Sequence, residues 1–139
     1  MTPMPRIALV VASLHVLLYI LLSLRVILHR RGHRIGIGTG GDAAMARKVR
    51  VHANFAEYVP LGLLMLALLE LSGTGAGPLW ACGLLLLGGR VLHALGLGGS
   101  AGYSMGRLTG MMLTLGVLLA MAAMGIWRFA AAMTMTMTP

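Results

Sequence analysis

Four apolar stretches constrain the fold of this chain more than any other feature. A helix needs about 20 residues to cross the hydrocarbon core of a bilayer. The composition, with 58% hydrophobic and 10% charged residues, is far from that of a soluble domain. The sequence therefore predicts a single all-α integral membrane domain over residues 1–139, a bundle of four transmembrane helices with a frayed Met/Thr tail at 133–139. The predicted helices cover residues 7–28, 51–71, 79–97 and 108–127.

Basic residues concentrate in the first connection between these helices, and they predict the topology. The positive-inside rule places this connection in the cytoplasm, with both termini and the 72–78 link outside. The net charge of +8 then reflects topology and attraction to anionic headgroups. It does not favour a nucleic-acid partner, because no basic face with interleaved aromatic residues lies outside the predicted membrane segments. The basic residues concerned are Arg30, Arg31, Arg34, Arg47, Lys48 and Arg50.

A polar face opens the second helix, at a depth where polar groups are unusual. At about 100° per residue, Arg50, Asn54 and Glu57 fall within an arc of about 60°, and Tyr58 lies at its edge. Ionisable groups at membrane depth are costly, and they almost always face a bundle interior or a wet cavity. This face is therefore the strongest candidate for a binding site.

Further basic residues lie at a similar depth on the other helices. At 1.5 Å per residue, Glu57 and Arg90 both lie about 10 Å from the cytoplasmic side, with His93 one turn below Arg90. Arg25, Arg50 and Arg107 lie nearer the interface, so four cations oppose one carboxylate. Two interpretations stay open and are compatible: a Glu57–Arg90 ion pair that ties two helices together, and a pocket for an anionic ligand.

Several shorter patterns carry weaker signals. The glycine-rich run at 36–41 matches GxGxxG, but no predicted strand precedes it, and we interpret it as a loop. His29 and His33 have the i,i+4 spacing of a metal pair, yet no third ligand lies nearby in the sequence, so no metal is predicted. Cys82 is the single cysteine, which predicts a small buried residue. The small residues of 106–110, with a GxxxG pattern, predict close helix packing.

The pattern Arg50-x-x-x-Asn54-x-x-Glu57-Tyr58-x-Pro60 resembles the signature of the MAPEG superfamily, the membrane-associated proteins of eicosanoid and glutathione metabolism. The resemblance covers nearly the whole chain, since it includes the four helices, the basic first connection and Arg90. It implies a homotrimer that holds glutathione, as a co-substrate, between neighbouring subunits on the cytoplasmic side.

The same resemblance implies roles for individual residues. Arg107 is similar to the arginine that stabilises the glutathione thiolate. His93, which stands where eukaryotic relatives often carry a tyrosine, is also implied in glutathione binding. Arg30 and His52 would reach glutathione from the neighbouring subunit. The other residues implied in glutathione binding are Arg50, Asn54, Glu57, Tyr58 and Arg90.

The resulting functional prediction is a glutathione transferase or peroxidase of the bacterial inner (plasma) membrane. It would act on a lipophilic electrophile that enters from the lipid bilayer. One alternative is a member of the same family that binds glutathione or another anion without turnover. A second is a small four-helix transporter with Glu57 as its coupling carboxylate.

Overall fold

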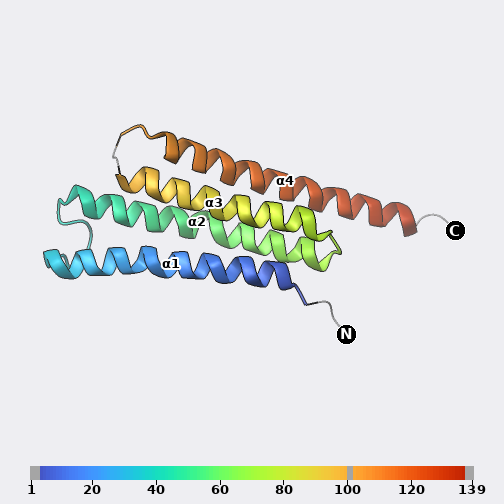
Figure 1. Cartoon of the computed structure of the whole chain (residues 1–139), viewed down its shortest axis with the longest axis horizontal. Coiled ribbons are helices and arrows are strands. Elements are labelled where there is room, and N and C mark those ends of the chain that lie inside the picture. The colour runs from blue at the N-terminus through green and yellow to red at the C-terminus, as the bar shows by residue number, and fades with distance from the viewer. Residues whose placement is uncertain (1–3, 100–101, 137–139) are drawn as a thin grey trace.

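Four long helices make up the fold (Figure 1) in this computed structural model, which describes residues 4–99 and 102–136. They run antiparallel in chain order, and each is long and apolar enough to cross a membrane. The prediction of an all-α, four-helix membrane fold is confirmed at this level. The helices are α1 Arg6–His33, α2 Ala43–Leu71, α3 Ala76–Gly99 and α4 Met105–Thr136.

Every helix extends beyond the apolar stretch that predicts it. α2 begins at Ala43, directly after Asp42, whose side chain accepts hydrogen bonds from the backbone N–H groups of Ala44 (2.7 Å) and Met45 (3.1 Å). This is an N-cap, and it adds two turns before Val51. Residues 133–136, predicted as a frayed tail, belong to α4, whereas 137–139 lie outside the described residues. An apolar stretch shows which part of a helix can contact lipid, but the backbone hydrogen bonds of the helix continue beyond it.

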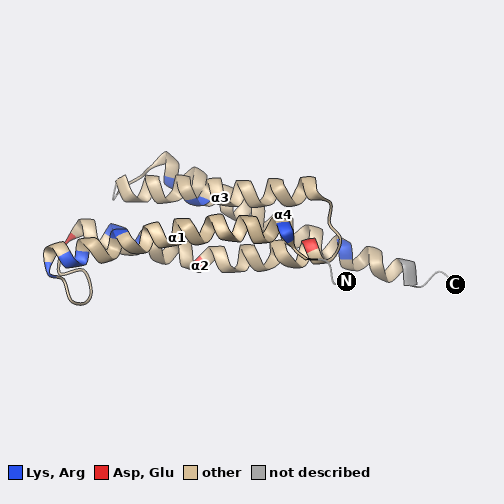
Figure 2. Ribbon diagram, turned by 60° about the horizontal axis from the view of Figure 1, so that its bottom comes forward, with Lys and Arg blue, Asp and Glu red and all other residues tan. Residues whose placement is uncertain are grey.

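One end of the bundle carries most of the positive charge. The α1–α2 and α3–α4 connections lie at this end, and the two chain termini lie at the other (Figure 1). Lys and Arg gather around the α1–α2 connection (Figure 2), and we call this end the basic end. The glycine-rich run forms an irregular link there between two helices, with φ of 66°, 59° and 77° at Gly38, Gly40 and Gly41. Its interpretation as a loop is confirmed.

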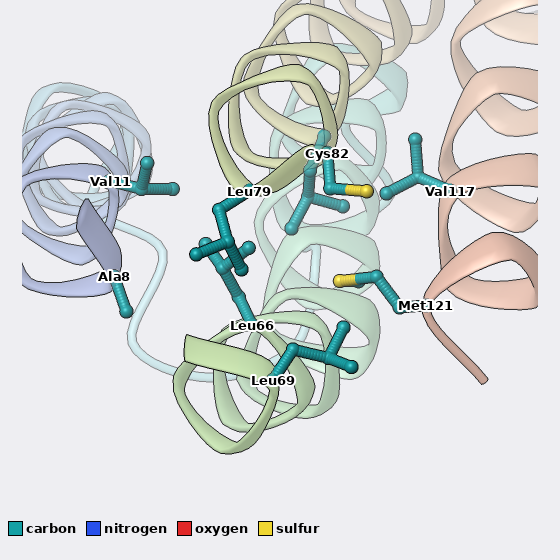
Figure 3. Packing of buried hydrophobic residues seen from close by; sticks show 9 residues of the cluster. Ala8, Val11, Leu66, Leu69, Leu79, Cys82, Val117 and Met121 are labelled. Carbon is teal, nitrogen blue, oxygen red and sulfur yellow. The ribbon is translucent and has the colours of Figure 1, made fainter. Parts of the chain in front are cut away.

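The interior is apolar in two places. One cluster fills the end away from the basic end and includes Leu66, Leu79, Cys82, Val117 and Met121 (Figure 3). Cys82 is buried there as predicted. A second cluster joins α1, α2 and α3 nearer the basic end, and its buried members are Leu22, Val51, Phe55, Val59, Ala94 and Leu97.

Glycines bring α3 and α4 into backbone contact. A Cβ atom added to Gly110 would lie 2.5 Å from the carbonyl oxygen of Gly89 and would also collide with the backbone nitrogen of His93. A Cβ atom on Gly106 would lie 3.2 Å from the carbonyl oxygen of Leu92. The predicted close packing is confirmed. We call Gly89, Gly96, Gly106 and Gly110 the glycine seam.

The first turn of α1 is capped by a residue from another helix. Pro5 occupies the N-cap position and supplies no side-chain hydrogen bond. Instead, the Glu70 carboxylate on α2 accepts from the backbone N–H groups of Ile7 (2.9 Å) and Ala8 (2.7 Å). A carboxylate is favourable at this position because the helix N-terminus carries a partial positive charge. Glu70 therefore fastens the start of α1 to the end of α2.

Candidate functional site

The predicted polar face of α2 exists, and its members bind one another. Arg50 donates to the Glu57 carboxylate at 3.0 and 3.4 Å. Asn54 Nδ2 lies between them and donates to Glu57 at 3.4 Å. The side chains of Arg50 and Glu57 are 58% and 46% exposed in the single chain, so this ion pair lies on its surface.

Arg90 lies behind this face and is 1% exposed. Its Nη2 donates to Asn54 Oδ1 at 2.6 Å, and its Nη1 donates to Thr114 Oγ1 at 3.3 Å. The guanidinium carbon also lies 5.7 Å from the centre of the Tyr58 ring, within the range of a cation–π contact. Arg90 thus ties α2, α3 and α4 together.

The Glu57–Arg90 ion pair, one of the two interpretations of the sequence, is wrong. Among the described residues, Glu57 pairs with Arg50. Arg90 instead reaches the buried amide of Asn54, which is 4% exposed. Arg50 holds the carboxylate at the surface, and the neutral amide takes the buried position, where a charged group costs more.

His93 lies about one turn from Arg90 on α3 and is also buried. It is 3% exposed, and its Nδ1 lies 3.4 Å from Arg90 Nη2. Because a guanidinium can only donate, Nδ1 is the acceptor in this contact and the ring proton belongs on Nε2. Figure 1 shows that α2, α3 and α4 are neighbours along this stretch of the bundle.

An open cleft of about 610 Å³ lies between α2, α3 and α4, near the basic end. Its lining includes Arg50, Asn54, His93, Tyr103 and Arg107. We call it the arginine cleft. Two of the predicted binding residues of α2, Arg50 and Asn54, line it together with Arg107 of α4, the predicted thiolate-stabilising arginine. The other two residues of the predicted polar face, Glu57 and Tyr58, do not line it. The structure therefore brings Arg50, Asn54 and Arg107 together within one chain.

The glycine seam positions Arg107 in this cleft. A Cβ atom on Gly96 would collide with the backbone nitrogen of Arg107 and would lie 2.7 Å from the carbonyl carbon of Gly106. The first turn of α4 therefore rests directly on the backbone of α3, one turn from His93. The α4 N-terminus also adds a partial positive charge at this place.

Two predicted residues lie elsewhere in the chain. His52 faces α1, where its Nε2 lies 3.0 Å from the Ser23 hydroxyl and its ring lies 4.8 Å from the Tyr19 ring. Arg30 lies near the end of α1. Neither lines the arginine cleft. Sequence reasoning missed Thr114, whose hydroxyl donates to the Gly110 carbonyl (2.8 Å) and accepts from Arg90, because a threonine within an apolar helix gives no distinct signal.

The charge in and around the cleft favours an anionic ligand. Arg50 and Arg107 line it, and Arg90 stands behind Asn54. Of the three acidic residues in the chain, Glu57 lies beside the cleft and is already bonded to Arg50. A cleft lined by one sign of charge with low-dielectric walls concentrates ligands of the opposite sign.

Comparison with known proteins agrees with this architecture. The inner membrane protein YecN of Escherichia coli (strain K12) is 32% identical over 85 residues, which are 61% of this chain and 65% of that protein. YecN of Escherichia coli O6:H1 (strain CFT073) matches to the same extent. The match thus spans slightly less than two thirds of the length of these relatives. A family model described as the MAPEG family matches residues 8–127. The chain therefore belongs to the MAPEG family.

Proposed function

We propose that this protein binds glutathione in the arginine cleft and transfers it to, or uses it to reduce, a lipophilic electrophile. The observation that carries the proposal is that Arg50, Asn54, His93 and Arg107 line one cleft near the basic end. Glutathione offers two carboxylates, one ammonium group and a thiol. Guanidinium groups bind carboxylates through paired charge-assisted hydrogen bonds.

The chemistry requires a thiolate, and Arg107 is placed to stabilise one. A free thiol has a pKa near 8.5, and a neighbouring guanidinium lowers it, which raises the population of the nucleophile at neutral pH. In the transferase reaction the sulfur lone pair forms a carbon–sulfur bond with the electrophile. The leaving group departs with the electrons of the broken bond, and the thiol proton passes to solvent.

We place the working assembly in a bacterial inner membrane as a homotrimer. Its basic end would face the cytoplasm, as the positive-inside rule predicts. The name of YecN as an inner membrane protein supports this membrane. His52 and Arg30 lie outside the cleft of their own subunit, so they would reach glutathione only from a neighbour. Large apolar side chains exposed on α1 and α4, such as Leu17 and Leu119, would meet lipid or neighbouring subunits.

Calorimetric titration of glutathione into the purified protein in detergent tests the binding. Arg50→Ala should weaken glutathione binding more than tenfold, because a lost charge-assisted hydrogen bond is worth about 1.5–3 kcal/mol. Arg31→Ala is the matched control, since it removes an exposed arginine at the end of α1. Normal affinity in a folded Arg50→Ala variant would place the site elsewhere.

Arg107→Leu separates binding from chemistry. Affinity should stay within a few-fold, whereas the ultraviolet absorbance of bound thiolate at pH 7 and the rate of conjugation to an aryl halide should fall. Raising the pH should partly restore the rate, because hydroxide then removes the thiol proton. Unchanged thiolate absorbance would remove Arg107 from the mechanism. Binding without thiolate in either protein would favour a family member that binds glutathione without turnover.

A further inference from the structure

Three metal-binding side chains meet at the basic end, away from the arginine cleft. His29 and His33 lie one turn apart on α1, and Asp42 is the N-cap of α2. His29 Nε2 lies 2.6 Å from Asp42 Oδ2. One ligand atom from each of the three residues lies within 4.8 Å of the other two. The loop between the helices thus supplies the third ligand that the sequence spacing did not reveal.

His33 already has the orientation of a metal ligand. His33 Nδ1 lies 3.0 Å from the His29 carbonyl oxygen, and only a protonated Nδ1 can form that bond. Its Nε2 therefore carries a free lone pair. The imidazole rings of His29 and His33 are stacked with centroids 4.0 Å apart, so both rings lie beside Asp42. A histidine whose second nitrogen donates to a carbonyl is the usual arrangement at metal sites.

We propose that His29, His33 and Asp42 form a binding site for a divalent transition-metal ion of the zinc class. Zinc–nitrogen and zinc–oxygen bonds of about 2.0–2.2 Å put tetrahedral ligand atoms about 3.3 Å apart. The observed separations, from 2.6 Å to within 4.8 Å, bracket this value, so small side-chain rotations complete the site. Three protein ligands leave a fourth position for water.

Lys48 is a competitor for this site. Its Nζ lies 2.6 Å from His29 Nδ1, and in the metal-free protein the ammonium donates to that nitrogen. The ring proton then belongs on Nε2, where it donates to Asp42. Metal binding through Nε2 requires that this proton move to Nδ1 and that Lys48 withdraw. The ammonium and the metal ion therefore exclude each other.

The surrounding positive charge limits the affinity of this site for a metal ion. Competition with Lys48 gives the site a testable signature, because removal of the ammonium should tighten metal binding. Arg30, Arg31 and Arg34 lie within a few residues of the histidines and repel a cation. We expect a micromolar dissociation constant instead of the far tighter binding of closed structural zinc sites. Bound metal would join the end of α1 to the start of α2.

The experiment is calorimetric titration of Zn²⁺ into tag-free, chelator-washed protein in detergent. One equivalent should bind per chain. His33→Gln should weaken binding at least tenfold. Asp42→Asn should do the same while preserving the cap, because Asn caps helices as well as Asp does. Lys48→Met should tighten binding several-fold. His52→Gln, which removes a histidine near Ser23, is the matched control and should leave zinc binding unchanged.

Replacement by Co²⁺ gives a second readout. Its visible absorption should report nitrogen coordination in the wild type and lose that signature in His33→Gln. Two results would overturn the proposal: no stoichiometric binding by either wild type or Lys48→Met, or binding that His33→Gln and Asp42→Asn leave intact. In either case the three residues form only a hydrogen-bonded link with Lys48.

Discussion

Replacement of Asn54 by leucine should reveal how strongly the buried charge of Arg90 depends on one amide. Leucine has the same number and branching of side-chain heavy atoms as asparagine, although its two methyl groups are bulkier, and it accepts no hydrogen bond. Arg90 would keep two hydrogen-bond partners, Thr114 at 3.3 Å and His93 at 3.4 Å, beside its contact with the Tyr58 ring. Its buried Nε already has no partner within the described part of the chain. A lost hydrogen bond to a charged group costs about 1.5–3 kcal/mol.

We therefore expect Asn54→Leu to lower the free energy of unfolding by about 3 kcal/mol, a change of about a hundredfold in the unfolding equilibrium. Unfolding in mixed micelles with increasing denaturing detergent, followed by circular dichroism, measures it. Asn54→Asp is the control, because it keeps an acceptor facing Arg90. The double variant Asn54→Leu/Arg90→Met should recover much of the loss, since both partners become apolar. An Asn54→Leu variant as stable as the wild type, or a double variant less stable than the single one, would refute this account of Arg90.

Three further predictions concern packing, capping and pH. Gly110→Ala should lower the free energy of unfolding by about 1–3 kcal/mol, because the added methyl group would collide with backbone atoms of α3. Gly88→Ala is the control, since no atom lies within 4 Å of its added Cβ, and equal effects of the two variants in thermal unfolding would contradict this packing. Glu70→Gln leaves one acceptor oxygen for two backbone N–H groups and should lower the local stability of the first turn of α1 by about 1 kcal/mol. Faster hydrogen exchange in that turn measures the loss, and unchanged exchange would argue against the cap. In the metal-free protein, the hydrogen bond from His29 holds the pKa of Asp42 at about 2, below its ordinary 3.8. The ionised carboxylate therefore stabilises the folded protein fully above pH 3.8, and this stabilisation is lost as the pH falls towards 2. Asp42→Asn should remove this pH dependence of hydrogen exchange at the start of α2, and an unchanged profile would assign it to another group.

The shared face of α2 could be predicted because helical geometry alone determines it. Arg50 and Glu57 are seven residues apart, two turns of helix, and that spacing holds in any bundle. The partner of Arg90 could not be predicted in the same way. Asn54 and Glu57 share one face and differ by less than one turn in depth. Which of them Arg90 reaches depends on the packing of α2 against α3, which the sequence of neither helix encodes alone.

Contacts between distant segments were also hidden from the sequence. The cap that Glu70 provides could not be predicted, because its partners at the start of α1 lie more than 60 positions away in the sequence. His29 and Asp42 are 13 positions apart and meet only because the intervening glycines adopt left-handed conformations. The predicted helices were too short for a related reason. Capping residues such as Asp42 lie outside the apolar stretch that marks a membrane span, so the helix continues beyond that stretch.

The glycine seam has a mechanical consequence for the arginine cleft. Where two helices touch through their backbones, no side chain can change rotamer to let them slide or separate. The wall that α3 and α4 form is therefore stiff, and the backbone of Arg107 moves only with the whole pair of helices. The opposite wall presents the long, half-exposed side chain of Arg50, which can swing. Molecules of different size should thus be accommodated by adjustment on the α2 side, while the backbone that carries Arg107 stays in place from one ligand to the next.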